Sequence, residues 1–205
     1  MGEPSTEVIE TLHYLIQRLC IAADYKDHET GQHISRIGQY SRLMAAQYGL
    51  DTATAEILFR TAPMHDIGKV GIADSILMKP GKLNEAEWEI MKYHTVFGAE
   101  IIGQHQNRLL VTAREIALHH HERWDGSGYP SGLKEETIPL SARIVSVCDV
   151  YDALVSKRHY KKAWKHEDAA QYISAQGGSQ FDPALVNVFQ AVYPQIRKAY
   201  DESIV

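Results

Sequence analysis

The sequence predicts a single domain of the all-α class. Apolar residues recur at three- and four-residue steps along several segments, and residues typical of helix ends flank those segments. No stretch has the period-two alternation of a half-buried strand. The chain has 205 residues, of which 44% are hydrophobic and 23% are charged, so it is long enough to bury one core and has an ordinary globular composition.

Two helices are predicted at the N-terminal end. The first covers about residues 5–25, in which apolar residues line one face. The second covers about residues 30–48, and Gly49 is a natural C-terminal cap for it. Residues 1–26 are expected to serve as a connector or a dimerisation element, which makes a homodimer one option.

A third helix leads to the first group of chemically active side chains. It begins at Asp51 or Thr52 and should be interrupted at Pro63, because proline lacks the amide hydrogen that a helix interior needs. A helix end at this point would direct His65 and Asp66 into a cavity.

Helix signals continue in the middle of the chain. Asn84 followed by Glu87 resembles a capping box and predicts a helix that continues to His94. Another helix is expected to run from Arg108 to the three consecutive histidines at 119–121.

The last third combines a long loop with two further helices. Residues 122–139 contain three glycines and two prolines and predict a structured loop, and loops of this length inside a domain are usually functional. Residues 140–155 are predicted to be helical. Asp182 followed by Pro183 predicts the start of the final helix.

Composition and charge argue against several classes of function. A formal net charge of -5 is unsuited to a nonspecific binder of long nucleic acids, which needs a basic surface. No apolar run approaches the roughly 20 residues of a membrane span, and a signal-peptide layout is missing, so no membrane contact and a cytoplasmic location are expected. Cys20 and Cys148 are expected to be reduced thiols packed as small hydrophobic side chains.

The eleven histidines are the unusual feature of the composition. His65 and Asp66 are adjacent, which alone is weak support for a metal site. Their companions, each on or at the end of a predicted helix, are His33, His94, His120, His121 and Asp149. Burying all of these groups without a metal would leave unpaired polar atoms, at about 1 to 3 kcal/mol each. Imidazole and carboxylate together suit iron, manganese or zinc.

Three motifs in this chain match one known family. They are "HDIGK" at 65–69, "HHERWDGSGYP" at 120–130 and "CDVYDAL" at 148–154. Together they resemble the HD-GYP subgroup of the HD phosphohydrolase superfamily, over about Asp27 to Leu185. The resemblance implies a single helical bundle of the HD phosphohydrolase type around a bi- or trinuclear metal site, with residues 27–205 as the catalytic domain.

The resemblance also implies two metal positions that share one carboxylate. The ligands implied for the first metal are His33, His65, Asp66 and Asp149. Those implied for the second are Asp66, His94, His120 and His121. Glu29, one helical turn before His33, matches a position that recruits a third metal in some members. The family implies iron or manganese as the divalent ion.

The function implied by the resemblance is metal-dependent hydrolysis of cyclic di-GMP to linear pGpG, with further cleavage to GMP left open. Two neighbouring cations would lower the pKa of a bridging water and neutralise charge on the phosphoryl oxygens. Asp66 and Lys69 are the expected catalytic residues, with Lys69 contacting the phosphate. The alternatives are a hydrolase of another cyclic dinucleotide and a catalytically silent sensor or interaction module.

Further residues are expected to hold the substrate. The resemblance assigns this role to Asp27, Lys69, Tyr129, Arg158 and Lys161. If the basic segment 157–165 is helical, four of its cations share one face: Arg158, Lys161, Lys162 and Lys165. The loop that carries Tyr129 has an alternative role, as the docking site of a partner such as a diguanylate cyclase domain.

Five histidines have no assigned role. They are His13, His28, His105, His119 and His166. His119 matters most among them, because a slip of one residue would exchange it with His121.

Overall fold

The computed structural model of the chain describes residues 6–27, 31–157 and 162–203, and within these ranges all the named elements are helices. They are α1 (Thr6–Asp27), α2 (Gly31–Tyr48), α3 (Thr52–Thr61), η1 (Ala62–Met64), η2 (Ile67–Gly71), α4 (Asp74–Leu77), α5 (Glu85–Lys92), α6 (His94–Ile102), α7 (Arg108–His119), η3 (Glu135–Thr137), α8 (Leu140–Val155), α9 (His166–Ala175) and α10 (Pro183–Ser203), where η marks a 3-10 helix. One isolated β-bridge joins Gly177 and Phe181. The all-α prediction is confirmed.

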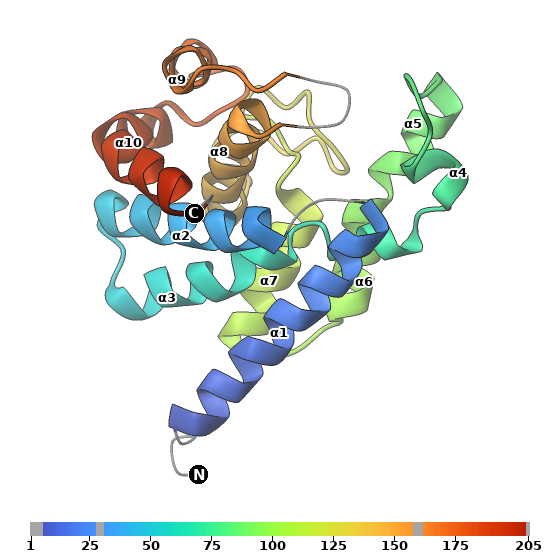
Figure 1. Cartoon of the computed structure of the whole chain (residues 1–205), viewed down its shortest axis with the longest axis horizontal. Helices are drawn as coiled ribbons and strands as arrows, with labels where there is room; N and C mark the ends of the chain where they lie inside the picture. The colour runs from blue at the N-terminus through green and yellow to red at the C-terminus, as the bar shows by residue number, and fades with distance from the viewer. Residues whose placement is uncertain (1–5, 28–30, 158–161, 204–205) are drawn as a thin grey trace.

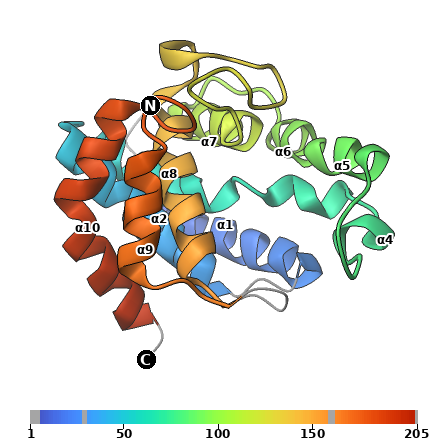
Figure 2. The ribbon, with the colours of Figure 1, turned by 90° about the horizontal axis from the view of Figure 1, so that it is seen from above.

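The core lies where α2, α8 and α10 pack together, as Figures 1 and 2 show. Tyr40 of α2 and Tyr151 of α8 are fully buried there, and their rings meet edge to face with centroids 6.0 Å apart. Phe189 of α10 packs against Tyr151. Cys148 belongs to this core, whereas Cys20 lies in a smaller cluster, and no disulfide joins them.

The turn that leads into the site follows α3 directly. Asp51 caps this helix, because its side chain accepts a hydrogen bond from the Thr54 backbone amide. The helix ends at Thr61, and Pro63 lies in the 3-10 turn η1. The predicted interruption is therefore confirmed, and a second 3-10 segment, η2, follows immediately after Asp66.

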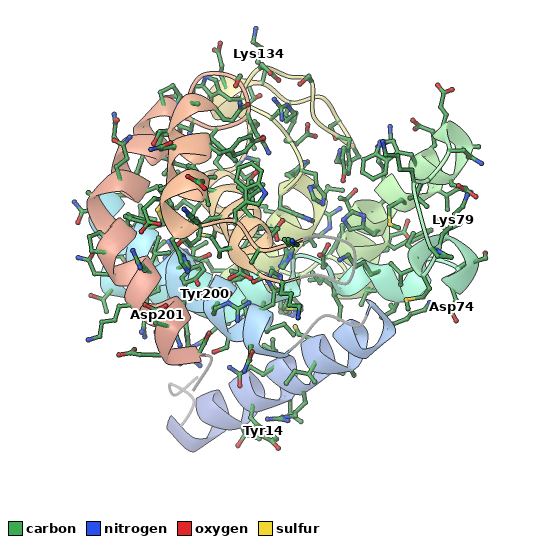
Figure 3. All side chains as sticks on the ribbon, turned by 45° about the horizontal axis from the view of Figure 1, so that its top comes forward. Tyr14, Asp74, Lys79, Lys134, Tyr200 and Asp201 are labelled. Carbon is green, nitrogen blue, oxygen red and sulfur yellow. The ribbon has the colours of Figure 1, made fainter. Side chains whose placement is uncertain are left out.

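Helix α1 is hydrogen-bonded to η2 and to the residue that follows it, through the side chain of Lys26. The Nζ atom of Lys26 donates hydrogen bonds to the backbone oxygens of Val70, in η2 (2.8 Å), and of Ile72, directly after η2 (2.7 Å). Further toward its N-terminus, α1 presents Tyr14 away from the molecule (Figure 3), and this side chain is 56% exposed. Within the described ranges, no helix has both the length and the apolar character required to cross a bilayer.

Two predictions about helices are corrected by the structure. The helix expected to continue to His94 ends at Lys92, and a new helix, α6, begins at His94. Lys162 and Lys165 lie in non-helical backbone before α9, so the helical alternative for the basic segment is wrong for these two residues. Both lysines are exposed to solvent.

Candidate metal centre

Two groups of histidines and carboxylates lie side by side in the middle of the molecule. The first cluster consists of His33 from α2, His65 from the turn before η2, and Asp149 from α8. The second cluster consists of Asp66, His94 at the start of α6, and His120 and His121 directly after α7. Within each cluster, the candidate ligand atoms lie within 4.8 Å of one another. The structure therefore brings together seven of the eight residues predicted as metal ligands.

Asp66 lies between the two clusters. Its Oδ2 atom is 3.2 Å from Nε2 of His65, which belongs to the first cluster. Its Oδ1 atom is 3.3 Å from Nε2 of His94 and 3.6 Å from Nε2 of His120, which belong to the second. One carboxylate therefore faces both groups, as a bridging ligand must.

Three imidazoles are oriented by backbone carbonyls. The Nδ1 atom of His65 lies 3.0 Å from the Ala62 oxygen, and that of His94 lies 2.7 Å from the Met91 oxygen. The Nδ1 atom of His120 lies 3.0 Å from the oxygen of Ile116, one helical turn earlier. A carbonyl oxygen can only accept, so each Nδ1 donates, and in its neutral form each ring has its lone pair on Nε2, where it can bind a ligand.

The inward atoms of these side chains are buried and unpaired. Among the described residues, Nε2 of His65, His94 and His120 and Oδ1 of Asp66 have no hydrogen-bond partner. Leaving such atoms unsatisfied costs about 1 to 3 kcal/mol each. Coordination of divalent cations by these nitrogens and oxygens would satisfy all of them, so the residues present fit a metal centre.

Charges within the centre shift several pKa values. Burial alone would lower the pKa of His65, but Asp66 and Asp149 raise it to about 10. Burial acts to raise the pKa of Asp66, yet the charges of Lys69 and His65 hold it well below its usual range. Burial, together with the neighbouring imidazoles, lowers the pKa of His121 well below its usual value. His121 is therefore neutral near pH 7, which is the form that binds metal.

His33 is oriented by a buried ion pair that the sequence reasoning missed. Its Nδ1 atom lies 2.7 Å from Oδ2 of Asp152, and the Arg36 guanidinium contacts both oxygens of that carboxylate, at 2.6 and 2.8 Å. Burial would raise the pKa of Asp152, but the hydrogen bonds from Arg36 and His33 hold it far below its usual range. The spacing offered a signal, because Arg36 and Asp152 each follow a candidate ligand by three residues on the same helix.

The glycine-rich loop is folded tightly onto the second cluster. A Cβ atom on Gly128 would lie 2.3 Å from the Arg123 nitrogen and 2.6 Å from the His121 oxygen, so only glycine permits this close approach. The buried carboxylate of Glu122 accepts hydrogen bonds from the Ser131 and Leu133 amides, at 2.8 and 3.1 Å. These contacts fix the path of the loop on both sides of the tyrosine that follows Gly128.

Tyr129 thereby lies at the edge of the metal centre. The centroid of its ring is 4.8 Å from that of His121 and 6.4 Å from that of His94. His119 points elsewhere, with Nδ1 3.7 Å from the Glu122 carboxylate, and it belongs to neither cluster. The residue exchange considered for the three histidines therefore does not occur.

The other predicted site residues are less completely described. The Nζ atom of Lys69 lies 2.8 Å from Oδ2 of Asp66, which brings its charge to the centre. Asp27 is the last residue of α1, and its side chain is not described. Glu29, Arg158 and Lys161 lie outside the described residues.

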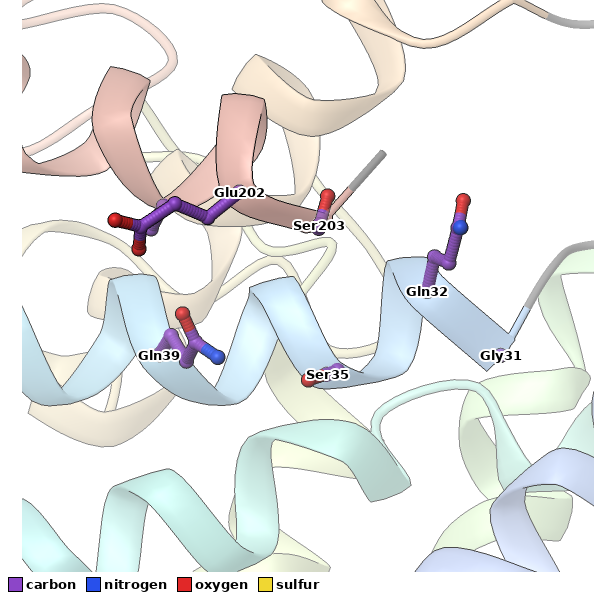
Figure 4. A pocket seen from close by; sticks show the side chains of 7 residues that line it. Gly31, Gln32, Ser35, Gln39, Glu202 and Ser203 are labelled. Carbon is purple, nitrogen blue, oxygen red and sulfur yellow. The ribbon is translucent and has the colours of Figure 1, made fainter. Parts of the chain in front are cut away.

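A separate pocket of about 380 Å³ lies between α2 and α10 (Figure 4). It is lined by Gly31, Gln32, Ser35, Gln39, Ala199, Glu202 and Ser203. No member of either cluster lines it, and it offers no cation for a phosphate. The pocket is therefore distinct from the centre that could carry out chemistry.

The chain is similar in sequence to a known family and to several known proteins. A family model described as HD domain matches residues 19–185. The chain is 47% identical over 181 residues to the cyclic di-GMP phosphodiesterase response regulator RpfG of Xanthomonas campestris, covering 88% of this chain and 48% of that protein. It is 45% identical over 179 residues to 3'3'-cGAMP-specific phosphodiesterase 2 of Vibrio cholerae, covering 87% of this chain and 34% of that protein.

Two further matches agree with these. A cyclic di-GMP phosphodiesterase of Thermotoga maritima is 43% identical over 196 residues, which is 95% of this chain and 53% of that protein. The crystal structure of the Vibrio cholerae cyclic GMP-AMP phosphodiesterase V-cGAP3 superposes with a TM-score of 0.70 at 22% identity, over 94% of this chain and 52% of that one, and supports the fold. The chain spans about a third to a half of the length of these relatives.

Proposed function

The chain belongs to the HD-domain family, as its resemblance to the HD-GYP group predicts, and on this premise we propose that it hydrolyses cyclic di-GMP to linear pGpG in a metal-dependent reaction. The observation that carries this proposal is the position of Asp66, whose two oxygens face two separate groups of buried imidazoles. A phosphodiester needs both an activated water and neutralisation of its charge, and a centre for two cations supplies both.

Each group of side chains has a part in this proposal. When bound, divalent cations supply Lewis acidity, which lowers the pKa of water and stabilises charge on the phosphoryl oxygens. Backbone-anchored imidazoles hold their lone pairs inward and avoid any reorganisation during the reaction. Lys69 adds a positive charge beside Asp66, where it would contact the phosphate and assist departure of the leaving oxygen.

We assign the clusters as ligands of two or three divalent metals, with iron or manganese as the native ion. The first metal would be held by His33, His65, Asp66 and Asp149, and the second by Asp66, His94, His120 and His121. Glu29 is the proposed ligand of a third. The donor set contains nitrogen and oxygen only, which suits these ions better than a thiol-seeking one.

The substrate would be held by Asp27, Lys69, Tyr129, Arg158 and Lys161. A second candidate substrate is 3'3'-cGAMP, because a relative named for that activity is 45% identical, close to the 47% of the cyclic di-GMP relative. Cleavage to GMP and a sensor without turnover remain outcomes of the experiment below. The loop of Tyr129 is also our candidate docking site for a diguanylate cyclase domain.

We also propose that the protein is cytoplasmic and that its N-terminal helix serves as a connector or a dimerisation element. The helix exposes Tyr14, Leu15 and Leu19, whose exposed fractions are 56%, 51% and 62%. An apolar helix face of this kind suits another helix.

The test is to quantify metal in anaerobically purified protein and to separate the products formed from cyclic di-GMP and 3'3'-cGAMP. We expect at least two metal ions per chain, and pGpG as product. Asp66→Asn should lose metal and reduce turnover by roughly 1000-fold. Asp168→Asn, which alters an exposed carboxylate on α9, is the matched control and should retain both. Metal-loaded protein that leaves both dinucleotides intact would overturn the proposed function.

A further inference from the structure

An exposed tryptophan, Trp88, lies beside the metal centre but is not one of its candidate ligands. The side chain of Trp88, on α5, is 46% exposed. Its ring meets that of Tyr129 at 82°, with centroids 6.1 Å apart. Tyr129 in turn lies against His121 of the second cluster, so the tryptophan is the next ring outward from the metal ligands. A large indole held this close to a reactive centre, with much of its surface in solvent, is suited to contacting a ligand.

The face of α5 that carries Trp88 is directed at the site. Lys92 lies one helical turn after Trp88, on the same face, and its Nζ atom lies 5.9 Å from the centroid of the Tyr129 ring. Ile90, two residues after Trp88, points to another side and is 47% exposed. The helix forms one end of the molecule (Figure 2), and the reciprocal capping box of Asn84 and Glu87 fixes its start.

We propose that Trp88 stacks on a purine base of the substrate and thereby selects diesters that carry bases. This inference rests on the proposed function, because a phosphodiester held at the metal centre places its attached nucleosides next to the surrounding side chains. Two perpendicular rings, Trp88 and Tyr129, form a corner that can receive the flat face of a base. Stacking on an aromatic ring accepts any base, so Trp88 acts equally on guanine and adenine.

The first test compares kinetics of three variants on cyclic di-GMP. Trp88→Ala should raise KM roughly tenfold, the loss expected for one base stack, with a smaller change in kcat. Trp88→Phe keeps a ring and should stay within about threefold of the unaltered enzyme. Ile90→Ala, on the other side of the same helix, is the matched control and should leave KM unchanged. With methyl p-nitrophenyl phosphate, a diester that carries no base, Trp88→Ala should retain its activity. A KM unchanged in Trp88→Ala would overturn the inference.

The second test observes binding without relying on turnover. Replacing Trp124 and Trp164 with phenylalanine leaves Trp88 as the sole tryptophan. Rapid mixing of this manganese-loaded protein with cyclic di-GMP should quench its fluorescence. If the unaltered protein releases no product and yet quenching occurs, the proposed function fails and base stacking stands. The opposite result has three parts: product forms, the fluorescence is not quenched, and Trp88→Ala has an unchanged KM. In that case base stacking fails and the proposed function stands.

Discussion

Hydrogen bonds at Nδ1 decide which ring nitrogen faces the metal centre in four of its histidines: His33, His65, His94 and His120. Carbonyl oxygens fix three of the rings, whereas His33 depends on the Asp152 carboxylate, which Arg36 holds in turn. A carboxylate behind an imidazole both sets its orientation and raises its basicity as a ligand. Asp152 is thus a positioning residue for the first cluster.

We expect Asp152→Asn to weaken metal binding at the first cluster by about 10- to 100-fold, because the amide keeps the shape of the carboxylate but not its charge. The measurement is a competition titration with a chelator, accompanied by thermal unfolding. Asp201→Asn, which alters an exposed carboxylate on α10 (Figure 3), is the control. A variant that unfolds at a lower temperature but binds metal with unchanged affinity would show that Asp152 has only a structural role.

The metal ligands inside the motifs were predictable, and the side chains that support them were not. His65, Asp66 and Asp149 lie in recognisable runs of sequence, and the structure brings them together. Asp152 lies inside the motif at 148–154, three residues after Asp149, but this position does not identify the side chains that it contacts, and Trp88 lies outside all three motifs. Their importance comes from contacts with residues more than 40 and more than 100 positions away, and no local pattern encodes such contacts.

At the level of helices, the close packing of η2 against α6 sets the distance between two members of the second cluster, Asp66 and His94. A Cβ atom on Gly68 would lie 1.9 Å from the His94 oxygen and 2.3 Å from the Gly98 nitrogen. Both are backbone atoms and cannot move aside without shifting a helix. Asp66 directly precedes η2 and His94 is the first residue of α6, so their separation depends on this contact.

Gly68→Ala should therefore destabilise the fold by about 1 to 3 kcal/mol and reduce metal content, because the overpacked contact pushes η2 from α6. Chemical denaturation and metal quantification check the two effects. Gly177→Ala is the matched control, since its nearest atoms lie 3.6 Å from the added Cβ. Equal stability of the two variants would contradict the expected overpacking.

Amphipathic helices with clear end signals were predictable, and three others were not. The interior of α6 contains Gly98 and β-branched residues, which are weak helix formers, so tertiary packing decides its conformation. Helix α9 buries only Ala169 and Ile173, too few for a clear period. Helix α4 has four residues and buries none of them. Local sequence cannot reveal helices whose stability comes mainly from their neighbours.

The metal centre joins distant parts of the whole molecule. Its seven described residues come from α2, the turn after η1, α6, the residues after α7, and α8, so an ion bound there would connect elements across the fold. A ligand that binds only the native state adds to the free energy of unfolding.

Chelation of the metal should lower the melting temperature by roughly 5 to 10 °C, because binding at a hundredfold excess over Kd contributes about 2.7 kcal/mol in a chain of this size. Calorimetry before and after chelation, followed by addition of manganese, is the measurement. Asp66→Asn should show little response to the chelator. Unaltered melting of the normal protein after its metal has been removed would argue against this structural contribution.

The position of Asp66 between the two clusters would make their loading with metal interdependent. The first ion to arrive would immobilise the side chain, and the second would then find a group that is already ordered. Such linkage is reciprocal, so the factor by which the first ion raises the affinity for the second is also the factor by which the second raises the affinity for the first. When the concentration of free metal falls, both positions would therefore lose their ions over the same range of concentration. The side chain of Asp66 would set that range.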